Sequence, residues 1–221
     1  MSERTGKTND EGEPYSHPDP PDGYHHPERS SSLEGITDYV TTFPGLRIVG
    51  TGGLLALIAF WSVPFGLSTL REFLLGVSGD SVLIAVLVYV GGLIAISVVT
   101  IVVHERIHKL VIESYGYDVD IEYGFLLSFA LVEEQWIKRT HNLPTLIAPF
   151  ILISGVSILL CLTVPSQTLM IIFGAVFIIN TSASCNDILN FIDLMKRPDG
   201  TLAWLQREGD LVCGYIYEPK T

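Results

Sequence analysis

Four stretches of the 221-residue chain contain no Asp, Glu, Lys or Arg: residues 48–70, 81–103, 145–164 and 168–185. An α-helix needs about 20 apolar residues to cross the roughly 30 Å hydrocarbon core of a bilayer, and each stretch is close to that length. The pattern therefore predicts an α-helical membrane protein with about four transmembrane helices.

The periodicity changes after the second of these stretches. We expect its helix to continue to about Ser114 and to stop at Gly116. From Tyr117 to Phe129 apolar residues then alternate with polar ones, at first strictly, which is typical of extended strands. With Gly124 as a turn or bulge, this segment predicts a small cytoplasmic β-hairpin insertion, and a second strand-turn-strand pattern surrounds Gly209.

Composition supports a membrane protein and divides the chain into three parts. Hydrophobic residues make up 48% of the chain and the mean hydropathy is +0.41. Residues 1–44 are rich in Pro, Ser, Gly, Asp and Glu, which predicts a disordered acidic tail. Residues 45–195 form the four-span membrane domain, and residues 196–221 form a cytoplasmic C-terminal segment.

Charge indicates the orientation and excludes one class of partner. The formal net charge is −11, and no basic face exists, so we expect no nucleic-acid partner. With four spans both termini share one side of the membrane, and nearly all Lys and Arg fall on that side, leaving Arg71 opposite. By the positive-inside rule, the chain is a multi-pass protein of the cell membrane, with both termini and the segment after residue 103 in the cytoplasm.

A His-Glu-x-x-His motif lies where the second span ends. His104 and His108 are one helical turn apart, about 40° around the axis, so both side chains reach one metal ion. Glu105 lies beside them, where it can act as the general base for a zinc-activated water. The alternative is that the two histidines are interfacial residues, with Glu105 and Arg106 marking the end of a span.

A catalytic zinc site needs a third protein ligand and leaves the fourth position for water. We expect Asp187, because it lies at the cytoplasmic end of the fourth span and therefore at the depth of the two histidines. His141 is the most serious alternative ligand. Three further carboxylates are weaker rivals: Glu113, Glu133 and Glu134.

A polar stripe precedes Asp187 on the fourth span. Asn180, Ser184 and Asp187 share one helical face at spacings of four and three residues. Asn180 is a candidate for stabilising the transition state or for orienting a metal ligand. Its alternative role is an ordinary hydrogen bond between helices.

Several of these features together resemble a known family. They are the His104 to His108 motif, the alternating segment after it, the Ala148-Pro149 pair and the stripe from Asn180 to Asp187. They resemble the putative zincin peptidase family of membrane proteins, relatives of the site-2 protease group of intramembrane metalloproteases. The resemblance covers about residues 48–219 and implies a Zn²⁺ ion held by His104, His108 and Asp187, with Glu105 as the base. Asn186 stands where such families often have glycine.

The sequence therefore predicts a membrane-embedded zinc metallopeptidase that hydrolyses peptide bonds near the cytoplasmic membrane face. Its expected partners are the lipid bilayer and a peptide or membrane-protein substrate. The alternating segment either captures an extended substrate at a strand edge or merely caps the helices. The alternative function is a non-catalytic, zinc-stabilised membrane scaffold or a degenerate family member. A transporter is disfavoured because the spans show no internal repeat.

Overall fold

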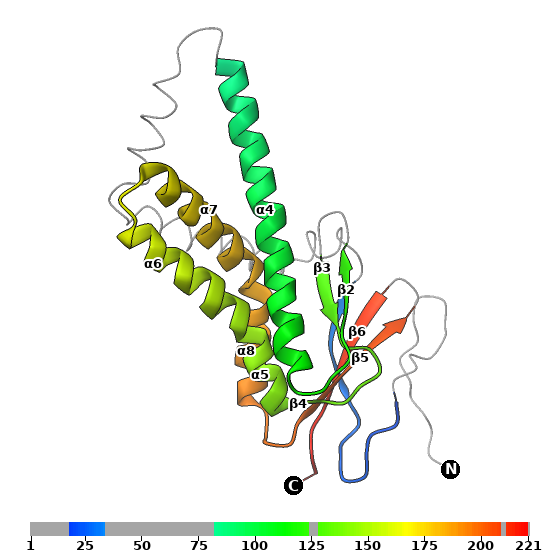
Figure 1. The fold of residues 1–221 in the computed structure, drawn as a ribbon. Helices are drawn as coiled ribbons and strands as arrows, with labels where there is room; N and C mark the ends of the chain where they lie inside the picture. The colour runs from blue at the N-terminus through cyan, green and yellow to red at the C-terminus, as the bar shows by residue number, and fades with distance from the viewer. Residues whose placement is uncertain (1–17, 34–81, 124–127, 209–210, 221) are drawn as a thin grey trace.

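The computed structural model of the chain describes residues 18–33, 82–123, 128–208 and 211–220. These residues form a group of helices and, beside one end of it, two small antiparallel sheets (Figure 1). The expected first span, residues 48–70, lies outside the described residues. The chain is thus mostly helical in its described part, as the apolar stretches predict.

Helix α4 (Val82–Glu113) carries the His-Glu-x-x-His motif in its last turns. The helix runs past residue 103 as expected, and Gly116 follows it with a φ of 87°. Glycine adopts this left-handed conformation without steric cost, and the Gly116 amide donates to the Glu113 carbonyl, which closes the helix end.

The third expected span is found as one continuous helical rod. It consists of α5 (Arg139–Pro149), the π-helical turn η2 (Phe150–Ser154) and α6 (Gly155–Thr163). Among the described residues, this rod is the one helix that is long and apolar enough to cross a membrane by itself.

The fourth expected span is bent. Helix α7 (Gln167–Ala183) is followed directly by α8 (Cys185–Lys196), and the two meet at an angle of 47°. The pair has the length and hydropathy of a span only if both helices are taken as one broken segment. The four-span arrangement therefore stays a prediction, since the described helices support one span, or two with the bent pair.

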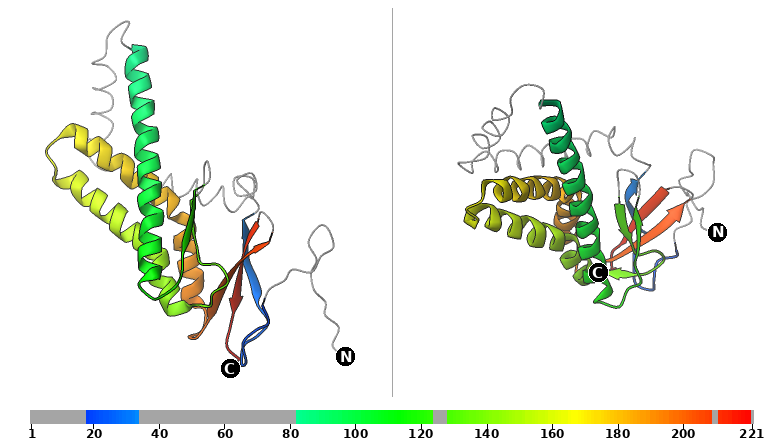
Figure 2. Two further views of the ribbon diagram at one scale, coloured as in Figure 1. Left: turned by 45° about the vertical axis from the view of Figure 1, so that its right-hand side comes forward. Right: turned by 45° about the horizontal axis from the view of Figure 1, so that its top comes forward.

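The hairpin predicted after the motif is present. Strands β2 (Asp120–Tyr123) and β3 (Ser128–Leu131) pair antiparallel, with Ile121 opposite Ala130. The hairpin packs along α4 and lies between the helices and the second sheet (Figures 1 and 2). A segment that follows the motif in sequence thus lies against it in space.

The second sheet has four strands in the order β1-β6-β5-β4. They are β1 (Glu28–Leu33), β6 (Leu211–Tyr217), β5 (Leu202–Glu208) and β4 (Ile137–Lys138). Strands β5 and β6 form the hairpin expected around Gly209, with seven paired positions from Leu202 to Glu208. The C-terminal segment is therefore a folded part of the protein.

The expectation of a disordered tail over residues 1–44 is wrong for residues 18–33. Strand β1 pairs antiparallel with β6, and the Tyr217 hydroxyl donates to the Pro18 carbonyl over 2.9 Å. The His25 amide donates to the Glu218 carbonyl, and the Lys220 amide donates to the Gly23 carbonyl. Composition misses this order because β1 is held by backbone hydrogen bonds to the edge of β6, which a polar strand makes as well as an apolar one.

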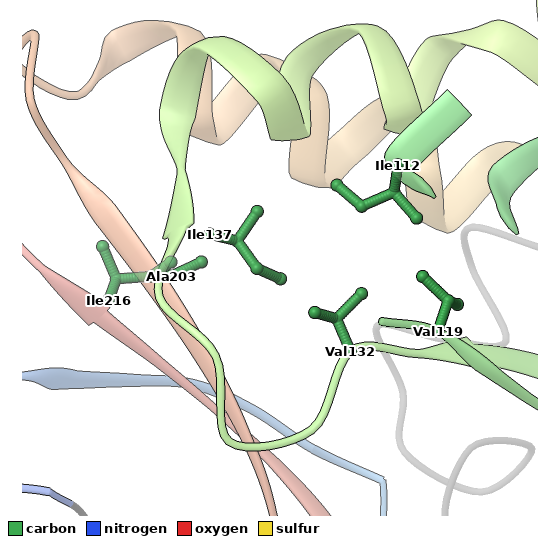
Figure 3. Close-up of a cluster of buried hydrophobic side chains, with 6 residues drawn as sticks. All are labelled: Ile112, Val119, Val132, Ile137, Ala203 and Ile216. Atoms are coloured by element: carbon green, nitrogen blue, oxygen red, sulfur yellow. The ribbon is translucent and has the colours of Figure 1, made fainter. Parts of the chain in front are cut away.

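A buried apolar cluster joins the end of α4 to both sheets (Figure 3). Its members come from α4, the hairpin region and the four-stranded sheet: Ile112, Val119, Val132, Ile137, Ala203 and Ile216. Ile112 lies one turn after His108 and is only 2% exposed. This packing fixes the last turns of α4, and with them the motif, relative to the hairpin.

Candidate metal centre

Three side chains from two distant parts of the chain meet beside the end of α4. His104 Nε2 lies 3.1 Å from His108 Nε2 and 3.2 Å from Asp187 Oδ2. His108 Nε2 lies 3.4 Å from the same carboxylate oxygen. The structure thus brings Asp187, at the start of α8, to the two histidines, and among the described residues these three form a group that could hold a metal ion.

In each histidine ring, the hydrogen-bond partner of Nδ1 determines which of the two ring nitrogens carries the proton. His104 Nδ1 lies 2.9 Å from Asn180 Oδ1, and His108 Nδ1 lies 2.8 Å from the Thr145 carbonyl oxygen. Both oxygens can only accept a hydrogen bond, so each Nδ1 carries a proton and donates it. In the neutral rings both Nε2 atoms therefore present lone pairs to the centre of the site.

The arrangement fits a zinc ion. Two ligand atoms that each lie ~2.0–2.1 Å from a tetrahedral zinc ion are roughly 3.3–3.4 Å apart. The three observed separations are 3.1, 3.2 and 3.4 Å. When both rings are neutral, two imidazole lone pairs and a carboxylate oxygen point at one another, and a bound cation stabilises this arrangement. Imidazole nitrogen and carboxylate oxygen are both common zinc ligands.

The site is buried but not closed. His104 and His108 are 4% and 8% exposed, whereas the side chain of Asp187 keeps 19% of its surface accessible. One turn before Asp187, the fully buried Ser184 hydroxyl has no hydrogen-bond partner among the described residues. The accessible part of the Asp187 side chain makes this the side from which water can reach the group.

Glu105 points toward the hairpin. Its Oε2 accepts a hydrogen bond from the Ala130 amide of β3 over 3.0 Å, and the residue is 9% exposed. Glu105 lies beyond residue 103, where the expected span ends. Burial raises the pKa of its carboxyl, and the two nearby histidines oppose this shift. A carboxylate with a raised pKa is better suited to take up a proton near neutral pH.

Asn180 supports His104 and does not line an open pocket. It is completely buried, and its Nδ2 donates to the Pro149 carbonyl over 3.1 Å and to Ser154 Oγ over 2.8 Å. These two donations leave Oδ1 to accept from His104. Of the roles considered for Asn180, the geometry favours orienting a ligand.

The alternative third ligands lie elsewhere. His141 stacks on Tyr115 with ring centroids 4.3 Å apart, and its Nδ1 lies 3.1 Å from the Tyr117 hydroxyl. Glu113 is exposed and pairs with Lys109 over 3.2 Å. Glu133 and Glu134 are also exposed, in the segment that contacts β5.

Helix α8, which carries Asp187, is held by the start of α5. Arg139 Nε donates to the Leu194 carbonyl over 2.9 Å, and Nη2 donates to the Met195 carbonyl over 3.1 Å. These carbonyls belong to the last turn of α8, where a cation also interacts favourably with the helix dipole. The contact helps fix the position of α8, and thereby of Asp187, relative to α5.

Sequence reasoning missed three residues that act on the site. Thr145 and Ala130 contribute a carbonyl and an amide of the backbone, which residue type does not reveal. Ser154 Oγ accepts from Asn180 and lies 3.1 Å from Thr181 Oγ1. A polar residue in an otherwise apolar stretch is a signal that could have drawn attention to Ser154.

Comparison with known proteins agrees with this geometry. Residues 97–202 match the family described as putative zincin peptidase. The match covers α4 from Ser97, the hairpin and all helices through α8, and therefore includes the five residues His104, Glu105, His108, Asn180 and Asp187. No curated protein and no solved structure matches the chain.

Proposed function

With residues 97–202 assigned to the putative zincin peptidase family, we propose that this protein is a membrane-embedded zinc metallopeptidase. It hydrolyses peptide bonds near the cytoplasmic membrane face. The observation that carries the proposal is the convergence of His104 Nε2, His108 Nε2 and Asp187 Oδ2 within 3.4 Å of one another, next to a buried glutamate. His104, His108 and Asp187 would hold the ion.

A bound zinc ion supplies Lewis acidity, which polarises a carbonyl and makes water a stronger acid. Glu105 removes a proton from the attacking water as the water oxygen bonds to the scissile carbonyl carbon. Glu105 then gives the proton to the leaving nitrogen as the peptide bond breaks. Asn180 and the Thr145 carbonyl hold the two histidines in the tautomer that keeps both Nε2 atoms unprotonated.

The hairpin offers a place for the substrate. Since Ala130 donates to Glu105, its amide points away from the partner strand β2. The outer edge of β3 therefore faces the catalytic glutamate, and an extended peptide added at this edge would run past Glu105. This placement supports capture of the substrate as an additional strand.

Exposed apolar side chains support the membrane location. On α4 they include Ile94, Val98 and Val99, each more than half exposed, and on α6 they include Leu159 and Leu162 at 60% and 63%. Apolar surface of this extent marks contact with lipid or with another protein. We place the termini and the site on the cytoplasmic side, because the Lys and Arg residues of the loops gather there.

The test compares Glu105→Gln with Glu113→Gln, a control on the same helix that is exposed and away from the site. Purified protein in detergent is incubated with unfolded, alkylated casein, and cleavage and zinc content are measured together. We expect the wild type and Glu113→Gln to cleave, and Glu105→Gln to keep zinc without cleaving. Cleavage by Glu105→Gln contradicts the proposal, and zinc without any wild-type cleavage favours the non-catalytic scaffold.

A further inference from the structure

Helix α5 lacks one backbone donor at the depth of the metal centre. In an α-helix the amide of residue 149 donates to the carbonyl of residue 145. Residue 149 is a proline inside α5, so this amide has no hydrogen, and the proline ring also crowds the carbonyl four residues earlier. The Thr145 carbonyl is therefore available for another donor.

The donor that it receives is a metal-site histidine. His108 Nδ1 lies 2.8 Å from the Thr145 carbonyl oxygen, and Thr145 is only 8% exposed. A regular helix would have used this carbonyl internally. The Thr145 carbonyl thus accepts a hydrogen bond from His108 in place of one helical hydrogen bond. This bond fixes Nδ1 as the protonated nitrogen of the His108 ring.

The same irregular stretch supports the other histidine. The π-helical turn η2 begins directly after Pro149, and the Pro149 carbonyl accepts from Asn180 Nδ2 over 3.1 Å. Ser154, the last residue of η2, accepts from the same amide group over 2.8 Å. Asn180 in turn accepts from His104 Nδ1. Both histidines are thus held by the break in regular helix around Pro149.

We propose that Pro149 is a positioning residue of the metal centre. By withholding its amide, it leaves the Thr145 carbonyl to His108, and it opens the turn whose polar atoms hold Asn180 and, through it, His104. Pro149 does not touch the ion. The inference rests on the proposed function, since it assumes that His104 and His108 bind the metal.

The other reading of Pro149 is a proline that only bends a helix, and α5 contains a matched control for it. Pro144 lies in the same helix and frees the Thr140 carbonyl, but Thr140 is exposed. If bending alone mattered, both prolines would act on the site through helix shape. If the freed carbonyl matters, only the substitution of Pro149 changes the affinity for the metal.

The experiment measures zinc affinity of the full chain by competition with a chelator, for wild type, Pro149→Ala and Pro144→Ala. Loss of an outer partner of a ligating histidine lowers metal affinity by about 10–100-fold. We expect a loss in this range for Pro149→Ala and a change of less than about twofold for Pro144→Ala. Visible absorption of the Co²⁺-loaded proteins should change for Pro149→Ala only.

Wild-type affinity and an unchanged Co²⁺ spectrum in Pro149→Ala would overturn this inference while leaving the proposed function intact. Equal losses in both proline variants would also overturn it. A wild type that binds no zinc would overturn the proposed function and this inference with it. Should Pro149→Ala not fold, Pro149→Ser restores the same amide with a different side chain and must give the same loss of affinity.

Discussion

Asn180 lies 2.9 Å from His104, with Oδ1 accepting from Nδ1, although the two residues are 76 positions apart in the chain. The bond links α7 to α4 at a fully buried position and determines which nitrogen of His104 faces the metal centre. Removing Asn180 as the partner of His104 should therefore lower the metal affinity first.

We expect Asn180→Ala to lower zinc affinity by about 10–100-fold, because His104 loses the acceptor that fixes its ring. Thr181→Val is the control, since Thr181 lies one residue away and its hydroxyl lies beside Ser154 Oγ instead of His104. Its zinc affinity should stay within about threefold of the wild type. Affinities measured by chelator competition decide the matter, and an Asn180→Ala protein that binds zinc normally would remove the orienting role.

The Ala130 amide should matter for catalysis and not for metal binding. Ala130→Pro removes the N–H that Glu105 accepts from, and a proline is tolerated where the amide points away from the partner strand. We expect kcat to fall by about tenfold, which is less than the ~10²–10⁴ that a general base contributes, because the carboxylate itself remains. Zinc content should not change.

Ala130→Gly is the matched control, because it keeps the amide and removes only a methyl group. Casein cleavage and zinc content are measured on both variants. Equal activity of Ala130→Pro and the wild type would show that the hydrogen bond to Glu105 has no role in the reaction. Equal losses in the proline and glycine variants would point to a general weakening of β3.

The N-terminal segment should depend on Tyr217. Burial, with a smaller contribution from Asp19, raises the pKa of the Tyr217 phenol above its ordinary value, so the hydroxyl remains a donor to the Pro18 carbonyl. Tyr217→Phe should weaken the docking of residues 18–27 by about 1 kcal/mol, the net value of one hydrogen bond. Hydrogen exchange of the His25 amide, which donates to the Glu218 carbonyl, should accelerate by about fivefold.

Tyr24→Phe provides the comparison for Tyr217→Phe. The Tyr24 hydroxyl donates to the Gly200 carbonyl over 2.9 Å, but at an exposed position where water replaces the bond. Tyr24→Phe should therefore accelerate hydrogen exchange of the His25 amide less than Tyr217→Phe does. Fast exchange of the His25 amide in the wild type would contradict the paired arrangement itself.

The sequence predicted well those features that depend on local pattern. Uncharged stretches located the rod of α5 to α6 from Thr145 onward and the helix α7, although the rod begins earlier, at Arg139. Alternation located β2 and β3. The end of α4 shortly before Gly116 followed from the conformational freedom of glycine. Spacing along one helix placed His104 beside His108, and the expected common depth in a membrane selected Asp187, which lies beside His104 in the structure.

Features that depend on backbone groups far apart in the chain were not predictable in this way. Pairing of β1 with β6 gives no apolar pattern in the polar segment ERSSSL. Support of His108 by Thr145 depends on a carbonyl that Pro149 leaves free, so the informative residue is four positions from the atom that acts. The 47° bend between α7 and α8 falls at Ser184, within a stretch that the sequence pattern predicts to be one span. The relation to site-2 proteases stays a prediction.

We expect His104, His108 and Asp187 to bind one zinc ion. The test is the zinc content of the purified full chain, measured for the wild type, Asp187→Ala and His141→Ala after equal exposure to a limiting chelator. We predict close to one zinc per chain in the wild type and in His141→Ala, whose ring instead packs against Tyr115. Asp187→Ala should lose most of its zinc. A wild type without zinc would rule out this metal centre, and an Asp187→Ala protein that retains zinc while His141→Ala does not would make His141 the third ligand.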